Sequence, residues 1–212
     1  MFHKSSIFWE FARKAVHLSS LFIVIGYTLL LNYTSDRVAI LTMTGLLLIL
    51  LKIEYLRVEY KPKIAALFES LFRKHEKNNI SGAVFMVISC IICFSAFEYW
   101  VAFLALFMAI FGDLFSALIG RAIGKIKIYK KKTLEGTIAG LVANSIVGYL
   151  IMPDYFVLII SMSLAATVME LLTNKLDDNL TVPVFAGFIG QMVVYYGAVA
   201  LPPIDFTFLG LF

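Results

Sequence analysis

The chain has 212 residues, of which 61% are hydrophobic and 15% charged, and its mean hydropathy is +0.90. This composition excludes an ordinary water-soluble domain, which could not bury so much apolar surface. The formal net charge is only +4. Because membrane proteins carry an excess of cations on one side, this charge indicates contact with anionic membrane lipids and no nucleic-acid partner.

Seven apolar segments follow one another along the chain, and each is long enough, or nearly long enough, to cross a bilayer. They cover about residues 15–31, 37–51, 80–97, 99–120, 134–152, 155–173 and 182–201. No linker or clear repeat separates them. We therefore expect an all-α, polytopic membrane bundle of about seven transmembrane helices that forms a single domain over residues 1–212.

The cations predict the orientation of these spans. Of the 18 Lys and Arg residues, only Arg37 lies on the opposite side from the others when seven spans are drawn. The positive-inside rule then puts the N-terminus in the cytoplasm. No small-residue cleavage pattern follows the first span, so we expect it to remain as an anchor of a multi-pass protein.

Two polar groups come before the third span. Arg13 and His17 lie one helical turn apart, where either can steer an anionic or hydroxyl-bearing substrate, although a helix-end histidine explains the pattern equally well. The longer group, residues 52–79, has apolar residues at helical spacing from Ile64 to Phe72. This pattern predicts an amphipathic helix along the cytoplasmic interface, with Pro62 near its first turn.

The end of the fourth span combines a carboxylate with small residues. Asp113, Ala117, Gly120 and Gly124 are spaced i, i+4, i+7 and i+11. In a helix they form one stripe, which another backbone or a phosphate can approach closely. A carboxylate at membrane depth needs compensation, either from a base such as Arg121 or from Mg²⁺, a cation that prefers carboxylate oxygen. The basic loop that follows favours Mg²⁺.

That loop contains six cations within twelve residues. They are Arg121, Lys125, Lys127, Lys130, Lys131 and Lys132. A basic loop is often only a topology signal that contacts lipid. Here, however, Thr133 is placed to cap the next helix, whose N-terminus offers N–H groups to a phosphate. Glu135 suits the helix dipole and is also able to hold a lysine or a metal, and Gly136 follows it.

A second acidic group ends the sixth span. Glu170, Asn174 and Asp178 are spaced i, i+4 and i+8, so they share a face if the helix continues that far. A solvated turn explains Asp177 equally well, whereas Glu170 lies deeper in the apolar segment and demands compensation. We expect Glu170 and Asp178 to flank a common pocket.

These motifs together resemble the membrane family of dolichol kinase, phytol kinase and the CTP-dependent diacylglycerol kinases, to which phosphatidate cytidylyltransferases are distantly related. The landmarks are residues 13–18, 54–62, 76–82, 112–136 and 177–183. Residues 132–136 look closer to dolichol kinases, and residues 177–183 also resemble the phytol kinase branch. The chain is shorter than eukaryotic dolichol kinases, which favours a prokaryotic polyprenol kinase of the cytoplasmic membrane.

The resemblance implies that the γ-phosphoryl group of CTP moves to the hydroxyl of an isoprenoid alcohol, with Mg²⁺ as the cofactor. It implies that Asp113 and Asp178 hold the metal, and that Asp178 or Glu170 accepts the hydroxyl proton. Arg13 and His17 would face the lipid headgroup. The implied nucleotide-binding residues are Gly120, Arg121, Gly124, Lys131, Lys132, Thr133, Glu135 and Gly136.

Several alternatives to this function stay open. The acceptor is a polyprenol, phytol or diacylglycerol, and the nucleotide is CTP or another triphosphate. The same site suits cytidylyl transfer, which yields a CDP-lipid and pyrophosphate. A transporter would also use intramembrane carboxylates, but here the polar residues gather at one membrane face. Whether the protein forms a homo-oligomer is open as well.

Overall fold

The computed structural model describes residues 18–60, 80–130, 132–173 and 176–204. This part of the chain contains seven helices and one short hairpin. The helices are α2 (Ser20–Tyr33), α3 (Asp36–Tyr60), α5 (Gly82–Ala96), α6 (Tyr99–Ala122), α7 (Leu134–Ile151), α8 (Phe156–Leu172) and α9 (Asp178–Gly197). Strands β1 (Lys127–Tyr129) and β2 (Lys132–Thr133) pair in antiparallel fashion between α6 and α7.

Four of the described helices, α3, α6, α7 and α9, are long and apolar enough to cross a membrane. Helices α2, α5 and α8 are also apolar but have only 14, 15 and 17 residues. The expected helical membrane protein is therefore confirmed as a class. The hairpin is an addition that the apolar pattern did not predict.

Two helix boundaries differ from the sequence expectation. Helix α3 continues to Tyr60 through charged residues, and Arg57 donates to Glu54 at 2.6 Å within it, an i, i+3 pair that helices favour. Helix α9 begins at Asp178 because Asp177 caps it, accepting from the Asn179 N–H at 3.0 Å. The interfacial helix expected from Pro62 to Phe72 lies outside the described residues.

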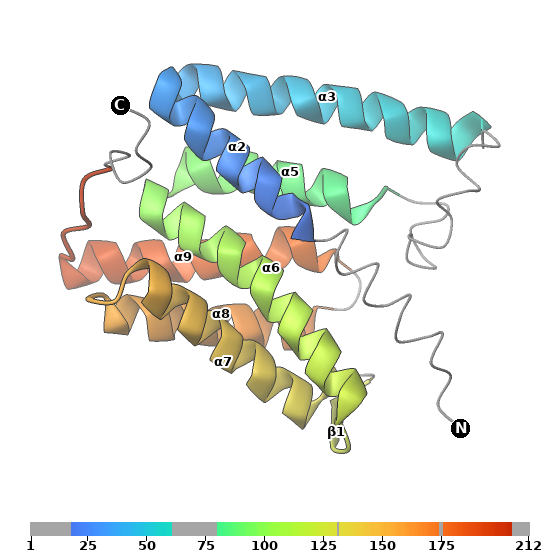
Figure 1. Ribbon diagram of the computed structural model, residues 1–212, viewed down its shortest axis with the longest axis vertical. Helices are drawn as coiled ribbons and strands as arrows, with labels where there is room; N and C mark the ends of the chain where they lie inside the picture. Colours follow the sequence, from blue (N-terminus) through green and yellow to red (C-terminus); the bar gives the residue numbers. More distant parts are fainter. Residues whose placement is uncertain (1–17, 61–79, 131, 174–175, 205–212) are drawn as a thin grey trace.

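Helix α6 is the shared centre of the fold. Its residues Leu104 and Met108 belong to a buried cluster with α8 and α9, whereas Leu106 and Ile110 belong to a second cluster with α2, α3 and α5. In Figure 1, α3 lies along one side of the bundle and α7 and α8 along the other. Apolar residues on both faces of α6 thus account for its central place.

One end of the bundle collects the polar elements. In Figure 1 the end of α6, the hairpin, the start of α7, the end of α8 and the start of α9 all lie on the same side of the molecule. These elements come from distant parts of the sequence, and they carry most of the charged residues singled out above. The candidate site is built at this end.

Candidate functional site

Glycines let α6 and α7 approach until their backbones touch. A Cβ on Gly136 would lie 2.7 Å from the Ser116 carbonyl oxygen and 3.0 Å from the Gly120 Cα. A Cβ on Gly120 would in turn lie 3.4 Å from the Gly136 Cα. Small residues that permit such an approach are typical of helix contacts inside membranes. The partner that comes close to the small-residue stripe is therefore the α7 backbone.

The predicted alignment of Gly124 with this stripe is wrong. Helix α6 ends at Ala122, and Gly124 lies in the loop that turns back toward β1. A Cβ on Gly124 would collide with the Gly120 carbonyl oxygen and would lie 2.5 Å from Thr133 Oγ1. The chain must leave the helix here because the hairpin needs an extended strand, and the absence of a side chain makes the turn feasible.

Glu170 is a buried carboxylate where α6, α7 and α8 meet. Only 9% of it is exposed, and its Oε1 accepts a hydrogen bond of 2.5 Å from Ser116 Oγ. Its other oxygen, Oε2, lies 3.8 Å from the position where a Cβ on Gly140 would be. Gly140 thus lies beside the carboxylate, and Ser116 supplies the hydrogen-bond donor that a buried carboxylate requires.

Lys132 connects the hairpin to this carboxylate. Its Nζ donates to the backbone carbonyl oxygen of Glu170, in the last turn of α8. Carbonyls at a helix C-terminus lack intrahelical partners, so a cation is favourable there. Strand β2 is thereby held against the end of α8, and a positive charge lies beside Glu170.

Two further acids belong to the same group. The carboxylates of Asp113 and Asp178 lie close enough to Glu170 to interact with it electrostatically, as does the Lys132 ammonium. Asp113 comes from α6, Glu170 from α8 and Asp178 from the first residue of α9. We call Asp113, Glu170 and Asp178 the acidic cluster. Several negative charges together attract cations and polar ligands.

The acids converge through a different geometry from the one that their spacing suggested. The condition for a shared helix face, that one helix continues from Glu170 to Asp178, is not met, because α8 ends at Leu172 and α9 begins at Asp178. Thr173 has an extended backbone, with φ −71° and ψ 123°, and Asp177 starts the next helix as its N-cap. The strong N-cap preference of Asp explains this break. Asn174 lies outside the described residues.

The same geometry bears on metal binding. Within residues 18–60, 80–130, 132–173 and 176–204, no three or more His, Cys, Asp or Glu side chains are arranged to hold a metal by themselves. The acidic cluster instead offers carboxylates from separate helices. That donor set fits Mg²⁺ that arrives with a triphosphate, because such a cation keeps several waters and takes only one or two protein carboxylates.

Glu135 and Thr133 organise the loop around the start of α7. The Glu135 carboxylate accepts from the backbone N–H groups of Lys125 and Ile126, at 3.0 and 3.2 Å. Thr133 is the N-cap, as predicted, and its Oγ1 accepts from the Gly136 N–H at 3.3 Å. The Leu134 N–H donates to the Ile126 carbonyl oxygen. Glu135 therefore fixes the loop. Because the N–H groups of Leu134 and Gly136 already have acceptors, the start of α7 would attract a phosphate mainly through the helix dipole.

The remaining predicted residues lie at the end of α6, in the loop before α7, or outside the described residues. Arg121, Lys125, Lys127 and Lys130 are exposed, and Lys130 adopts a left-handed conformation with φ 51° at the hairpin turn. Lys132 contacts α8 through its bond to the Glu170 carbonyl oxygen. The other predicted residues, Arg13, His17 and Lys131, lie outside the described residues.

Sequence reasoning missed the polar residues that support Glu170. Ser116 lies one turn after Asp113, where it could have been noticed as a polar side chain inside an apolar span. Asn144 is 1% exposed, and its Nδ2 donates to Thr167 Oγ1 at 3.4 Å, while its Oδ1 has no hydrogen-bond partner. Asn144 lies one turn from Gly140 on α7, and Thr167 lies one turn from Glu170 on α8. A buried polar pair thus lies one helical turn from Gly140 on α7 and from Glu170 on α8.

No family model, no curated protein and no solved structure matches this chain. Functional inference therefore depends on the site geometry and on the motif resemblance stated above.

Proposed function

We propose that this protein is a CTP-dependent lipid alcohol kinase that phosphorylates a polyprenol or dolichol-type isoprenoid alcohol. The observation that carries the proposal is the meeting of the acidic cluster with Lys132 at one end of an apolar helix bundle. Acids that bind a metal and a cation that binds phosphate are the groups that phosphoryl transfer requires. Their position at one end of an apolar bundle (Figure 1) supports access by a lipid substrate.

The proposal includes a membrane topology. All seven described helices would cross the bilayer of a prokaryotic cell, with the N-terminus and the acidic cluster in the cytoplasm. The distribution of Lys and Arg supports this orientation, with only Arg37 on the outer side. Helices α2, α5 and α8 are short for a span, and they would be accommodated by local thinning of the bilayer.

On the donor side, Lys132 would contact the β- and γ-phosphates of the nucleotide. It already lies beside Glu170, and the α7 dipole adds a favourable potential for negative charge. Asp113 and Asp178 would hold Mg²⁺, which neutralises charge on the transferring group. Arg121 and the other loop lysines would raise the local concentration of the anionic nucleotide.

On the acceptor side, a carboxylate of the cluster would take the proton of the lipid hydroxyl. Glu170 and Asp178 are the candidates, and Ser116 holds the Glu170 carboxylate in position through its 2.5 Å hydrogen bond. The hydroxyl oxygen forms a bond to the γ-phosphorus while the bond from that phosphorus to the β–γ bridging oxygen breaks. The products are CDP and a lipid monophosphate. Positioning and electrostatics supply most of the catalysis.

The test is an assay of the purified protein in lipid nanodiscs. Polyprenol, phytol and diacylglycerol are each offered with CTP, ATP, GTP and UTP, and both nucleotide and lipid products are identified. We expect CDP and polyprenyl phosphate, lost in Asp113→Asn and retained in Asp154→Asn, an exposed carboxylate beyond the far end of α7. Pyrophosphate as the product would replace the proposal with cytidylyl transfer. Failure to consume any nucleotide would refute it.

A further inference from the structure

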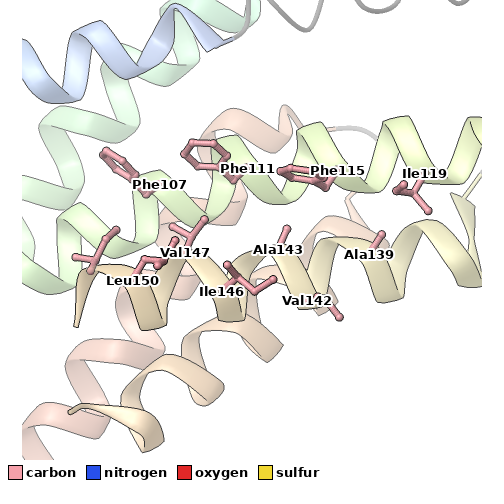
Figure 2. Close-up of a pocket in the computed structure, with 11 residues that line it drawn as sticks. Phe107, Phe111, Phe115, Ile119, Ala139, Val142, Ala143, Ile146, Val147 and Leu150 are labelled. Atoms are coloured by element: carbon pink, nitrogen blue, oxygen red, sulfur yellow. The ribbon is translucent and has the colours of Figure 1, made fainter. Parts of the chain in front are cut away.

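Two apolar grooves among the described residues are of similar size, each of about 600 Å³. Figure 2 shows the first, the α6/α7 groove, in which Phe107, Phe111 and Phe115 follow one side of α6 beside Ile146 and Leu150 of α7. The second, the α9 groove, lies among α5, α8 and α9. Its walls include Ile92, Met169, Thr181, Val184, Phe185 and Phe188. Both are large enough for a ligand with a hydrocarbon chain.

The α9 groove leads to the acidic cluster. Asp178, Thr181, Phe185 and Phe188 are spaced i, i+3, i+7 and i+10 on α9, so they follow one face of that helix. Thr181 and Phe188 lie about 10 Å apart along the helix axis, and Asp178 lies one turn beyond Thr181. The groove thus has an apolar length and one polar end.

The hydroxyl groups at that polar end are ordered. Thr181 Oγ1 lies 3.1 Å from Thr173 Oγ1, and each threonine also donates to a carbonyl of its own preceding turn. Met169 lines the groove and immediately precedes Glu170 in α8. The polar end is therefore bordered by the two helices that carry Glu170 and Asp178.

The α6/α7 groove has no comparable end. Asp113 is two residues from both Phe111 and Phe115, which places it about 200° around α6 from each, on the opposite face. The backbone contact at Gly136 also lies between this groove and Glu170, because it closes α6 against α7. A chain in this groove would be separated from the acidic cluster by the helix contact itself.

We infer that the α9 groove holds the hydrocarbon chain of the acceptor alcohol, with its hydroxyl beside Thr181 and within reach of Asp178. The inference rests on the proposed function and specifies its lipid path. A long-chain alcohol matches the groove because it is apolar along its length and polar at one end. Phe185 and Phe188 are 39% and 50% exposed, so the groove is open at its side to the surrounding hydrocarbon. The chain can therefore enter from within the bilayer.

A matched pair of substitutions tests the path. Val184→Phe fills the α9 groove, and Val142→Phe places the same side chain in the α6/α7 groove. We expect Val184→Phe to raise KM for a long polyprenol on the order of tenfold, a loss typical of altered apolar contacts, without changing KM for the nucleotide. Val142→Phe should leave both constants unchanged. Equal effects of the two variants, or a larger effect of Val142→Phe, would overturn the inference.

A second substitution and a binding readout keep the test decisive. If Val184→Phe does not fold, Ala96→Phe fills the same groove from α5, where the side chain is exposed. Separately, tryptophan is introduced at position 184 or 142, and its quenching by brominated phospholipid is measured against the parent protein. Added polyprenol should reduce quenching at 184 only.

The two tests separate the inference from the function on which it rests. A wild-type protein that phosphorylates no alcohol refutes the proposed kinase, and the quenching result then still decides whether a long-chain alcohol binds in the α9 groove. Protection at position 142, or at neither position, would overturn the inference. Protection at 184 alone would support it.

Discussion

The contact between α6 and α7 gives the sharpest prediction about stability. In Gly136→Ala, the new methyl would lie 2.7 Å from the Ser116 carbonyl oxygen and 3.0 Å from the Gly120 Cα, whereas ordinary contact begins at 3.4 Å. Both neighbours are backbone atoms, so no side chain can rotate to relieve the clash. Overpacking of this kind costs about 1–3 kcal/mol. Separation of the helices would also displace Ser116 from Glu170.

A glycine without neighbours provides the control. A Cβ on Gly45, inside α3, would meet nothing within 4 Å. Because alanine has the higher helix propensity, Gly45→Ala should stabilise the fold by about 0.5–1 kcal/mol. The free energies of unfolding of both variants would be measured by denaturation in mixed micelles. The reasoning fails if Gly136→Ala is as stable as the wild type, or if Gly45→Ala is the more damaging change.

Three further predictions concern the polar end of the bundle. Ser116→Ala removes the donor to a buried carboxylate and should lower the free energy of unfolding by about 1–3 kcal/mol, measured as above; an unchanged value would show that Glu170 does not depend on Ser116. Lys132→Met should raise KM for the nucleotide more than KM for the lipid. A larger increase in KM for the lipid would contradict the proposed contact between Lys132 and the nucleotide phosphates. Glu135→Ala should accelerate amide hydrogen exchange at Lys125 and Ile126, whereas no change there would mean that its carboxylate does not fix the loop.

Much of the fold could be predicted from apolar periodicity. The seven apolar segments overlap the seven described helices, and four of these, α3, α6, α7 and α9, are long and apolar enough to cross a membrane, where a helix satisfies its own backbone. The boundaries at α3 and α9 were less predictable. In α3 the Arg57–Glu54 pair lies beyond the end of the apolar segment, and in α9 the Asp177 cap lies before the start of the apolar segment.

The site was predictable in its residues and much less so in its geometry. Asp113 and Glu170 stood out because an acid in an apolar span demands compensation. That Asp113, Glu170 and Asp178 come together from three helices depends on the close contact at Gly136 and on the break at Thr173, neither of which follows from spacing. Glu135 was expected among the nucleotide-binding residues. In the structure its carboxylate accepts hydrogen bonds from the backbone N–H groups of Lys125 and Ile126 in the neighbouring loop.

The double burial of α6 limits how the protein can move. A tilt of this helix would open voids in two separate interiors at once, since Met108 and Ile110 belong to different clusters. We therefore expect Asp113 and Ser116, which lie in α6, to keep fixed positions relative to the rest of the bundle. The described residues of the hairpin belong to neither cluster, so this element can shift without opening either interior, and the Lys132 bond to α8 is what such a shift would break.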